Sequence, residues 1–203
     1  MKKILKDTLA LLVITLVAGL LLGIVYQITK EPIAKQNENA KLNAYRSVFE
    51  QLDKTEEISE TDIDTAQKAV KEAGYSTVTV NEAVKAYDAS GKYLGLIITV
   101  TDAGGYGGNI KMTVGIDSEA VITGLEFLEI SETAGLGMKA KEAKFKNQFI
   151  GMNTEYIQLT KTGATADYEF DAISSATITS RAVENGVNGA LVTYRTLGGA
   201  DSE

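Results

Sequence analysis

A short run of hydroxyl-bearing residues lies where an extended segment, ending near Phe170, is predicted to meet the last helix. It reads Asp171-Ala172-Ile173-Ser174-Ser175-Ala176-Thr177-Ile178-Thr179-Ser180-Arg181. Apolar residues then recur close to every 3.6 positions, which predicts one buried helical face made by Ile178, Ala182, Val187, Leu191 and Tyr194. Thr177 is therefore expected in the first helical turn, where free N–H groups and the helix dipole favour a phosphate group. A plain helix cap made by Asp171, Ser174 and Ser175 is the alternative.

The composition removes most other catalytic chemistry. The 203 residues include no Cys and no His, which excludes disulfides, thiolate nucleophiles, cysteine-ligated clusters and imidazole bases or ligands. Redox chemistry would have to belong to an organic cofactor, and a metal would need carboxylate or carbonyl ligands. The formal charge of -7 argues against a nucleic-acid partner. A hydrolase in which Lys161 activates Ser174 stays formally possible, although no spacing fixes their geometry.

Two glycine-rich loops lie upstream of the hydroxyl run. The segment 104–108 places Tyr106 among four glycines, which permit unusual backbone angles and close approach to a ligand. A loose turn is its other interpretation. The segment 131–137 places Leu136 between two glycines, where it is either a ligand contact or a plug of the core. A basic helix carrying Phe145 and Phe149 is expected to follow.

An uncharged segment near the amino terminus predicts a membrane anchor. The 22 residues between Asp7 and Lys30 carry no charge, and as a helix they would span roughly 33 Å, enough for a hydrocarbon core of about 30 Å. A signal peptide is the competing interpretation, but the apolar run is longer than a typical signal core. Lys2, Lys3 and Lys6 favour a cytoplasmic amino terminus, with the large domain on the outer side.

The rest of the chain predicts an α+β domain. Pro32 is expected to start a new segment, followed by an amphipathic helix with Leu42, Tyr45, Val48, Phe49 and Leu52 on its apolar face. Acidic residues 53–64 are interpreted as a solvated loop, with a calcium loop as the weaker alternative. Two hairpins, 84–100 and 109–130, predict an antiparallel sheet with one buried face. We therefore expect an anchor over 1–30, a connecting region over 31–74 and a ligand-binding domain over 75–203.

Five motifs occur in an order that resembles a known family. They are Gly-Tyr-Gly-Gly at 105–108, Val-Gly-Ile-Asp at 114–117, Glu-Thr-Ala-Gly-Leu-Gly at 132–137, Gln-Phe-Ile-Gly at 148–151 and Asp-Ala-Ile-Ser-Ser-Ala-Thr at 171–177. Their order resembles the FMN-binding domain shared by the G subunit of the Rnf electron-transport complex and the C subunit of the sodium-translocating NADH:quinone reductase. The single apolar segment and the compact length resemble the Rnf protein more closely.

The resemblance implies a covalent flavin. In this family FMN is joined through its phosphate to the last threonine of the fifth motif, here Thr177, by a flavin transferase that uses flavin adenine dinucleotide as donor. The family pattern also implies flavin contacts from three segments, which comprise Glu132, Thr133, Leu136, Gly137, Ser174, Ser175, Ala176, Tyr106, Gly107 and Gly108. No catalytic residue and no metal site is implied.

The sequence differs from the family pattern at two positions, and it contains a second threonine motif that resembles the attachment motif. Ser175 stands where the family has Gly, and a left-handed backbone there would cost Ser energy that Gly avoids. Ala134 stands where the family has Pro, which should loosen the loop. Thr165 ends a second Thr-Gly-Ala-Thr sequence. It lacks the upstream Asp and precedes an alternating, strand-like stretch, so Thr177 is favoured as the attachment point.

The resemblance implies an electron carrier without substrate chemistry of its own. It would act through covalent FMN inside an Rnf-type ferredoxin:NAD oxidoreductase that couples redox to Na⁺ or H⁺ transport, beside the other membrane and peripheral subunits. A stand-alone extracytoplasmic FMN carrier is the second hypothesis. The third is a cofactor-free, membrane-tethered binding module in which the Ser/Thr run only caps a helix.

Overall fold

The computed structural model describes residues 2–198 and divides the chain into two units, residues 1–41 and 42–203. Met1 and residues 199–203, which form the outer ends of the predicted anchor and domain, lie outside the described residues. The first unit is helical and belongs to α1 (Lys2–Val48). Its most apolar 18-residue window has a mean hydropathy of 2.8 and no side chain buried in the molecule. By length and composition this helix is able to cross a membrane.

The predicted break at Pro32 is wrong, because α1 continues through this residue to Val48. A proline inside a helix removes one backbone hydrogen bond and costs about 3 kcal/mol. The flanking sequence, rich in Ala, Lys, Glu and Gln, favours helix on both sides and offsets this cost.

The second unit is built on a five-stranded antiparallel sheet in the order β1-β2-β3-β4-β5. The strands are β1 (Lys54–Glu57), β2 (Val78–Tyr87), β3 (Tyr93–Asp102), β4 (Ile110–Asp117) and β5 (Ile122–Glu129). Both predicted hairpins are confirmed as β2–β3 and β4–β5, and β2 begins six residues earlier than expected. The predicted α+β class is likewise confirmed.

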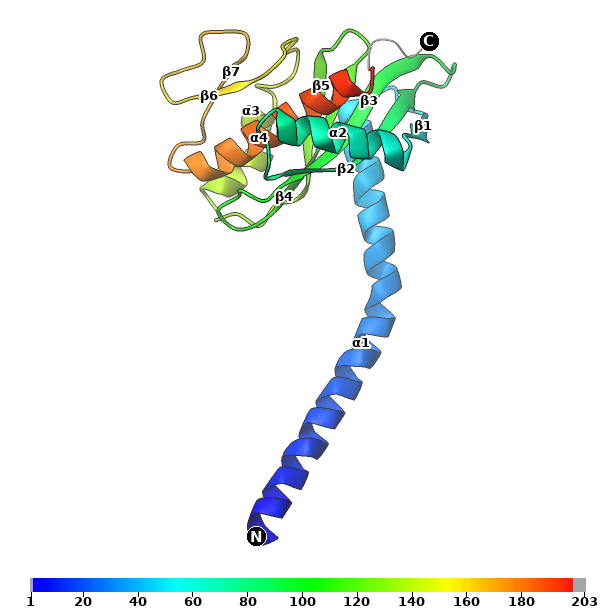
Figure 1. The fold of residues 1–203 in the computed structure, drawn as a ribbon, viewed down its shortest axis with the longest axis vertical. Helices are drawn as coiled ribbons and strands as arrows, with labels where there is room; N and C mark the ends of the chain where they lie inside the picture. Colours follow the sequence, from blue (N-terminus) through cyan, green and yellow to red (C-terminus); the bar gives the residue numbers. More distant parts are fainter. Residues whose placement is uncertain (1, 199–203) are drawn as a thin grey trace. The chain divides into compact units, whose positions relative to one another are not determined.

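One face of the sheet carries α2 (Glu60–Glu72) and α4 (Thr177–Thr196), as Figure 1 shows. The main core lies between the sheet and these two helices and includes the fully buried Met112, Val187 and Ala190. The close approach of α4 depends on its glycines: a Cβ added at Gly186 would lie 2.7 Å from the Met112 methyl carbon. The sheet thus fixes the position of α4, at whose first turn the hydroxyl run ends.

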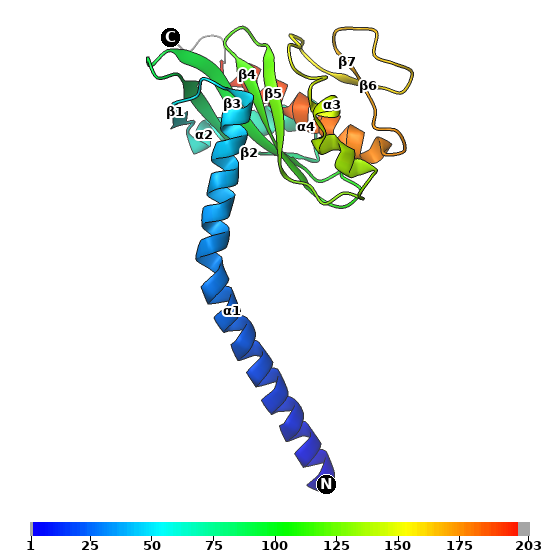
Figure 2. The ribbon, with the colours of Figure 1, turned by 180° about the vertical axis from the view of Figure 1, so that it is seen from behind.

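The prediction of one buried face is wrong, because the last turns of α1 cover the opposite face of the sheet as well (Figure 2). Tyr45, Val48 and Phe49 are buried there in a second cluster with Val84, Ala86 and Ile97. Val48 sits over two glycines that are paired across β4 and β5: a Cβ at Gly115 would lie 2.8 Å from the Val48 Cβ, and one at Gly124 would lie 3.0 Å from the Val48 Cα. The amphipathic character predicted for this segment is confirmed at its carboxyl end, while Leu42 is exposed.

The solvated loop predicted over residues 53–64 is wrong. Its first part forms β1, an edge strand that pairs with Val84–Tyr87 through its backbone and so needs no apolar side chains. Its second part opens α2, where Ser59 accepts a hydrogen bond from the Asp62 amide (3.2 Å). Ala66 and Val70 of this helix are buried, Val70 in the main core. The predicted functional boundaries after residues 30 and 74 stay a prediction. In the fold, however, β1 belongs to the same sheet as β2 to β5, and α2 lies in the same helix layer as α4.

Short elements complete the unit between β5 and α4. They are η1 (Gly137–Lys141), α3 (Ala143–Lys146), β6 (Gln158–Thr160) and β7 (Glu169–Asp171), with β6 and β7 parallel. Phe145, Phe149 and Phe170 pack against one another edge-to-face or tilted, with ring centroids 4.8–5.9 Å apart. This aromatic cluster joins the basic segment to β7, immediately before the hydroxyl run.

Candidate functional site

The start of α4 is open to a ligand. Thr177 is the first residue of the helix, as predicted, and the capping position is Ala176 (φ -135°), which offers no side-chain hydrogen bond. The plain cap by Asp171, Ser174 or Ser175 is therefore not formed. Instead the Ser180 hydroxyl, inside the helix, accepts from the Ile173 amide (2.9 Å) and donates to the Ala176 carbonyl (3.0 Å). The first-turn N–H groups keep their capacity to bind an anion.

A left-handed residue brings the chain into this turn. Ser175 has φ 64°, a conformation that favours glycine. The left-handed backbone considered for this position is therefore present, although the residue is Ser. Its side chain is exposed and makes no hydrogen bond among the described residues. The strained turn at Ser175 directs the chain from the aromatic cluster into the helix.

The loop 131–137 lies opposite the start of α4. The Thr133 carbonyl accepts hydrogen bonds from the amides of Leu136 (3.1 Å) and Met138 (3.2 Å), which fold the loop back on itself. Glu132 is only 8% exposed, and its Oε1 accepts from the Gly107 amide at 3.2 Å. Gly137 leaves the space in which Glu132 and Thr179 approach each other, because a Cβ there would lie 2.6 Å from the Thr179 Oγ1. Three distant segments therefore meet at one place.

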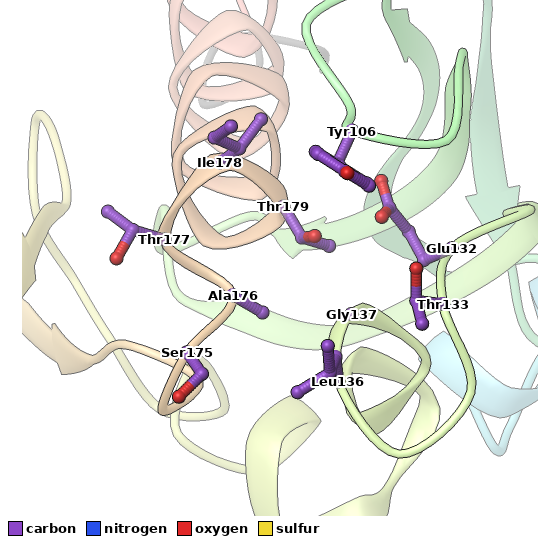
Figure 3. A pocket seen from close by; sticks show the side chains of 10 residues that line it. All are labelled: Tyr106, Glu132, Thr133, Leu136, Gly137, Ser175, Ala176, Thr177, Ile178 and Thr179. Atoms are coloured by element: carbon purple, nitrogen blue, oxygen red, sulfur yellow. The ribbon is translucent and has the colours of Figure 1, made fainter.

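These segments enclose a cavity of about 570 Å³, a size usual for small-molecule sites. Figure 3 shows Ser175 and Thr177 on one side and Tyr106, Glu132 and Thr133 on the other. Among the predicted residues, the cavity brings together Tyr106, Glu132, Thr133, Leu136, Gly137, Ser175, Ala176 and Thr177. Leu136 is 40% exposed, so it does not plug the core.

Three predicted contacts do not line this cavity. Gly107 and Gly108 are absent from its lining, although the Gly107 amide donates a hydrogen bond to the Glu132 carboxylate. Ser174 faces a neighbouring cavity of about 470 Å³ with Lys139, Lys144 and Gln148. Ser174 and Ser175 therefore line different cavities on either side of the left-handed residue.

The sequence interpretation missed Ile178 and Thr179, which also line the cavity. The prediction that Ile178 belongs to the buried face of the helix is wrong: this residue is 53% exposed, whereas Thr179 is 1% exposed. The buried face passes through Thr179, Ala182, Val183, Gly186 and Val187. The spacing of these small and apolar residues is a usable signal, which the apolar character of Ile178 obscures.

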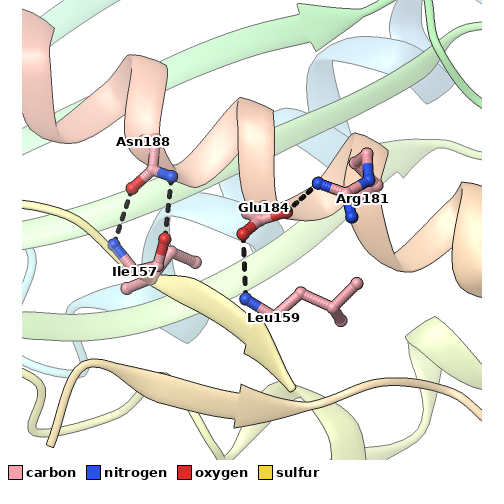
Figure 4. Close-up of polar contacts among 5 residues, drawn as sticks. All are labelled: Ile157, Leu159, Arg181, Glu184 and Asn188. Carbon is pink, nitrogen blue, oxygen red and sulfur yellow. Dashed lines mark hydrogen bonds and ion pairs between the residues drawn. The ribbon is translucent and has the colours of Figure 1, made fainter. Parts of the chain in front are cut away.

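Buried polar groups of α4 attach the β6 segment beside the site (Figure 4). Asn188 accepts from the Ile157 amide (2.7 Å) and donates to the Ile157 carbonyl (3.0 Å). Glu184 accepts from the Leu159 amide (2.8 Å), and its other oxygen pairs with Arg181 (3.3 Å). These contacts satisfy backbone groups that a short strand would otherwise leave unpaired.

Thr165, which ends the second threonine motif, lies in a different environment. Its amide and its hydroxyl both donate to the Glu169 carboxylate, at 2.9 and 3.0 Å. These bonds, together with that from the Ala166 amide, hold the pKa of Glu169 below its ordinary value. A carboxylate beside the Thr165 oxygen repels a phosphate group. Thr165 does not line the cavity at the start of α4, and no hydrogen bond among residues 2–198 joins Lys161 to Ser174.

Comparison with known proteins gives the same assignment along most of the chain. Residues 105–192 match the model of the FMN-binding domain, and residues 1–48 match that of the RnfG N-terminal region. The chain is 32% identical over 196 residues to the G subunit of the ion-translocating oxidoreductase complex of Aliivibrio fischeri, covering 94% of this chain and 90% of the relative. It is 29% identical to the G subunit of the Na(+)-translocating ferredoxin:NAD(+) oxidoreductase complex of Acetobacterium woodii, covering 97% and 94%.

A solved structure supports the fold. The crystal structure of the C subunit of the Na(+)-translocating NADH-quinone reductase from Parabacteroides distasonis aligns with a TM-score of 0.59 at 20% identity, over 84% of this chain and 96% of that one. The chain therefore belongs to the family of G subunits of ion-translocating oxidoreductase complexes, and it contains their FMN-binding domain.

Proposed function

We propose that the protein is a membrane-anchored electron carrier that holds FMN covalently at Thr177, as the G subunit of an ion-translocating ferredoxin:NAD oxidoreductase. The observation that carries this proposal is the cavity of about 570 Å³ between the first turn of α4 and the loop 131–137. It joins the attachment threonine to the loop residues that the family pattern assigns to the flavin.

The residues present fit a phosphate at one end of the cavity. Thr177 is half-buried at the uncapped start of α4, where the helix dipole and free N–H groups stabilise negative charge. During attachment the Thr177 Oγ1 would form a bond to the FMN phosphorus of flavin adenine dinucleotide while the bond from that phosphorus to the AMP leaving group breaks, and the hydroxyl proton would pass to water. A flavin transferase is the partner that this reaction requires. The bond removes the need for tight reversible binding.

The residues present also fit a flat aromatic ring system with a polar edge. Leu136, Ile178 and Tyr106 supply exposed apolar surface around the cavity mouth. Thr179, a residue that is 1% exposed, supplies a hydroxyl at the cavity wall that forms no hydrogen bond with another described residue. A bound flavin supplies reversible transfer of one or two electrons. The residues on the two sides of the cavity would orient it (Figure 3).

The membrane part of the proposal rests on α1. We propose that residues 8–29 cross the membrane with the amino terminus in the cytoplasm, because Lys2, Lys3 and Lys6 precede the apolar segment. The FMN domain then faces the extracytoplasmic side. Its partners there are the other subunits of the complex, in keeping with the names of its relatives.

The test is flavin fluorescence in a denaturing gel after expression with a flavin transferase. The wild-type band should fluoresce and the Thr177→Ala band should not. Thr165→Ala is the matched control and should keep its fluorescence. Covalent flavin retained in Thr177→Ala would overturn the attachment site. A wild-type protein that stays without flavin would overturn the proposed function and favour a cofactor-free module.

A further inference from the structure

Glu132 is the one charged residue that lines the cavity at the start of α4 among the described residues. The other lining residues are Tyr106, Thr133, Leu136, Gly137, Ser175, Ala176, Thr177, Ile178 and Thr179, none of which carries a charge. Lysines do lie nearby, but Lys139 and Lys144 line the neighbouring cavity with Ser174. Among the described residues, this carboxylate is therefore the one formally charged side chain that a ligand in the first cavity meets, besides the partial positive charge at the start of α4.

This carboxylate has little compensation. Glu132 is 8% exposed, and its hydrogen-bond partner is a neutral backbone donor, the Gly107 amide, at 3.2 Å. Within residues 2–198 no Lys or Arg forms an ion pair with it. Because a buried charge is screened poorly, it acts on its surroundings more strongly than an exposed glutamate would.

The surrounding backbone holds the carboxylate in this position. A Cβ at Gly105 would lie 2.9 Å from its Oε1, and one at Gly137 would lie 2.8 Å from its Oε2. The glycines of both loops therefore make room for the two carboxylate oxygens. Thr179, 1% exposed and without a hydrogen-bond partner among the described residues, points toward the same side of the cavity (Figure 3). The Glu132 carboxylate is therefore held at the wall of the cavity.

We infer that Glu132 lowers the reduction potential of the flavin held at Thr177. Each electron that a flavin accepts adds negative charge, which an uncompensated carboxylate in the same poorly solvated cavity opposes. Glu132 thereby makes the carrier a stronger reductant and favours transfer of its electron to the next acceptor. This inference rests on the proposed function, and Glu132 acts as a positioning and electrostatic residue that undergoes no reaction itself.

The test is a redox titration of the full-length flavinylated protein with dithionite, followed by visible absorption. Glu132→Gln keeps an oxygen that accepts from the Gly107 amide but removes the charge. It should increase the equilibrium constant for accepting one electron at least tenfold, which is a rise of about 59 mV. Glu132→Asp keeps the charge and should stay near the wild-type potential. Glu142→Gln, an exposed glutamate that lines only the neighbouring cavity, should leave the potential unchanged.

A second pair of variants tests the same electrostatics without touching Glu132. Ile178 lines the cavity and is 53% exposed, so it accepts charged replacements. Ile178→Lys should raise the potential and Ile178→Glu should lower it. The inference would be overturned by a flavinylated Glu132→Gln protein whose equilibrium constant for accepting one electron lies within twofold of the wild-type constant. Absence of covalent flavin from wild type would instead refute the proposed function, so the two failures are distinguishable by gel fluorescence.

Discussion

Replacement of Ser175 by glycine tests whether the turn before α4 is strained. Ser175 has φ 64°, a conformation that costs a side-chain-bearing residue about 1–2 kcal/mol. Glycine removes this cost but adds freedom to the unfolded chain, which offsets about 0.4–1 kcal/mol. The Ser175 hydroxyl makes no hydrogen bond among the described residues, so its loss adds nothing. We expect Ser175→Gly to be more stable by about 0.5–1 kcal/mol.

The assay is thermal and urea unfolding of the full-length protein without flavin, in detergent. For a domain of this size about 1 kcal/mol corresponds to a rise in Tm of about 2–4 °C. Ala120→Gly is the matched control, because Ala120 also has φ 64° but lies in the turn between β4 and β5. Its gain should be smaller, since the Ala120 methyl group packs against the main core. If Ser175→Gly is no more stable than wild type while Ala120→Gly gains, the strain argument for Ser175 is wrong.

Three further predictions concern the site and its supports. Gly137→Ala places a methyl group 2.6 Å from the Thr179 Oγ1 and should lower the free energy of unfolding in urea by about 1–3 kcal/mol. The covalent flavin measured by gel fluorescence should fall as well. Unchanged flavin content would contradict this prediction. Asn188→Ala removes both hydrogen bonds to Ile157 and should cost about 1–3 kcal/mol in the same assay, whereas Asn147→Ala, at an exposed position, should cost little. The Glu169 carboxyl, whose pKa the hydrogen bonds from Thr165 and Ala166 lower from 4.5, should titrate below that value by NMR. Its contribution to stability is therefore present above pH 4.5 and is lost as the pH falls through the lowered pKa, and a midpoint at or above 4.5 would refute this.

Local patterns in the sequence predict the strands and the helix that carries Thr177. The runs of β2 to β5, rich in Val, Ile and Thr and separated by turn residues, and the 3.6-residue spacing after Thr177 are properties of neighbouring residues, so they can be seen without knowing the fold. The prediction for the acidic segment is wrong because it gives the charges more weight than two local signals. These are the Ser59–Asp62 cap and the helical spacing of Ala66 and Val70.

The inner wall of the site cannot be predicted in the same way. Glu132 and Gly107 are separated by 25 positions, and their contact depends on how β4 and β5 bring two loops together. The exposed position of Ile178 is likewise set by the orientation in which α4 packs on the sheet. The left-handed turn at residue 175, in contrast, is indicated by the family motif, whose glycine here is replaced by Ser.

The packing of Val48 against Gly115 and Gly124 determines where the chain can be shortened to give a soluble flavoprotein. A truncated chain that begins at or before Leu42 keeps the last turns of α1 on the sheet, as the division between residues 41 and 42 indicates. A chain that begins after Phe49 would instead expose Val84, Ala86 and Ile97 to water. An exposed apolar sheet face of this kind promotes aggregation. The last turns of the membrane helix are therefore a folding requirement of the electron-carrying domain as well as its connection to the anchor.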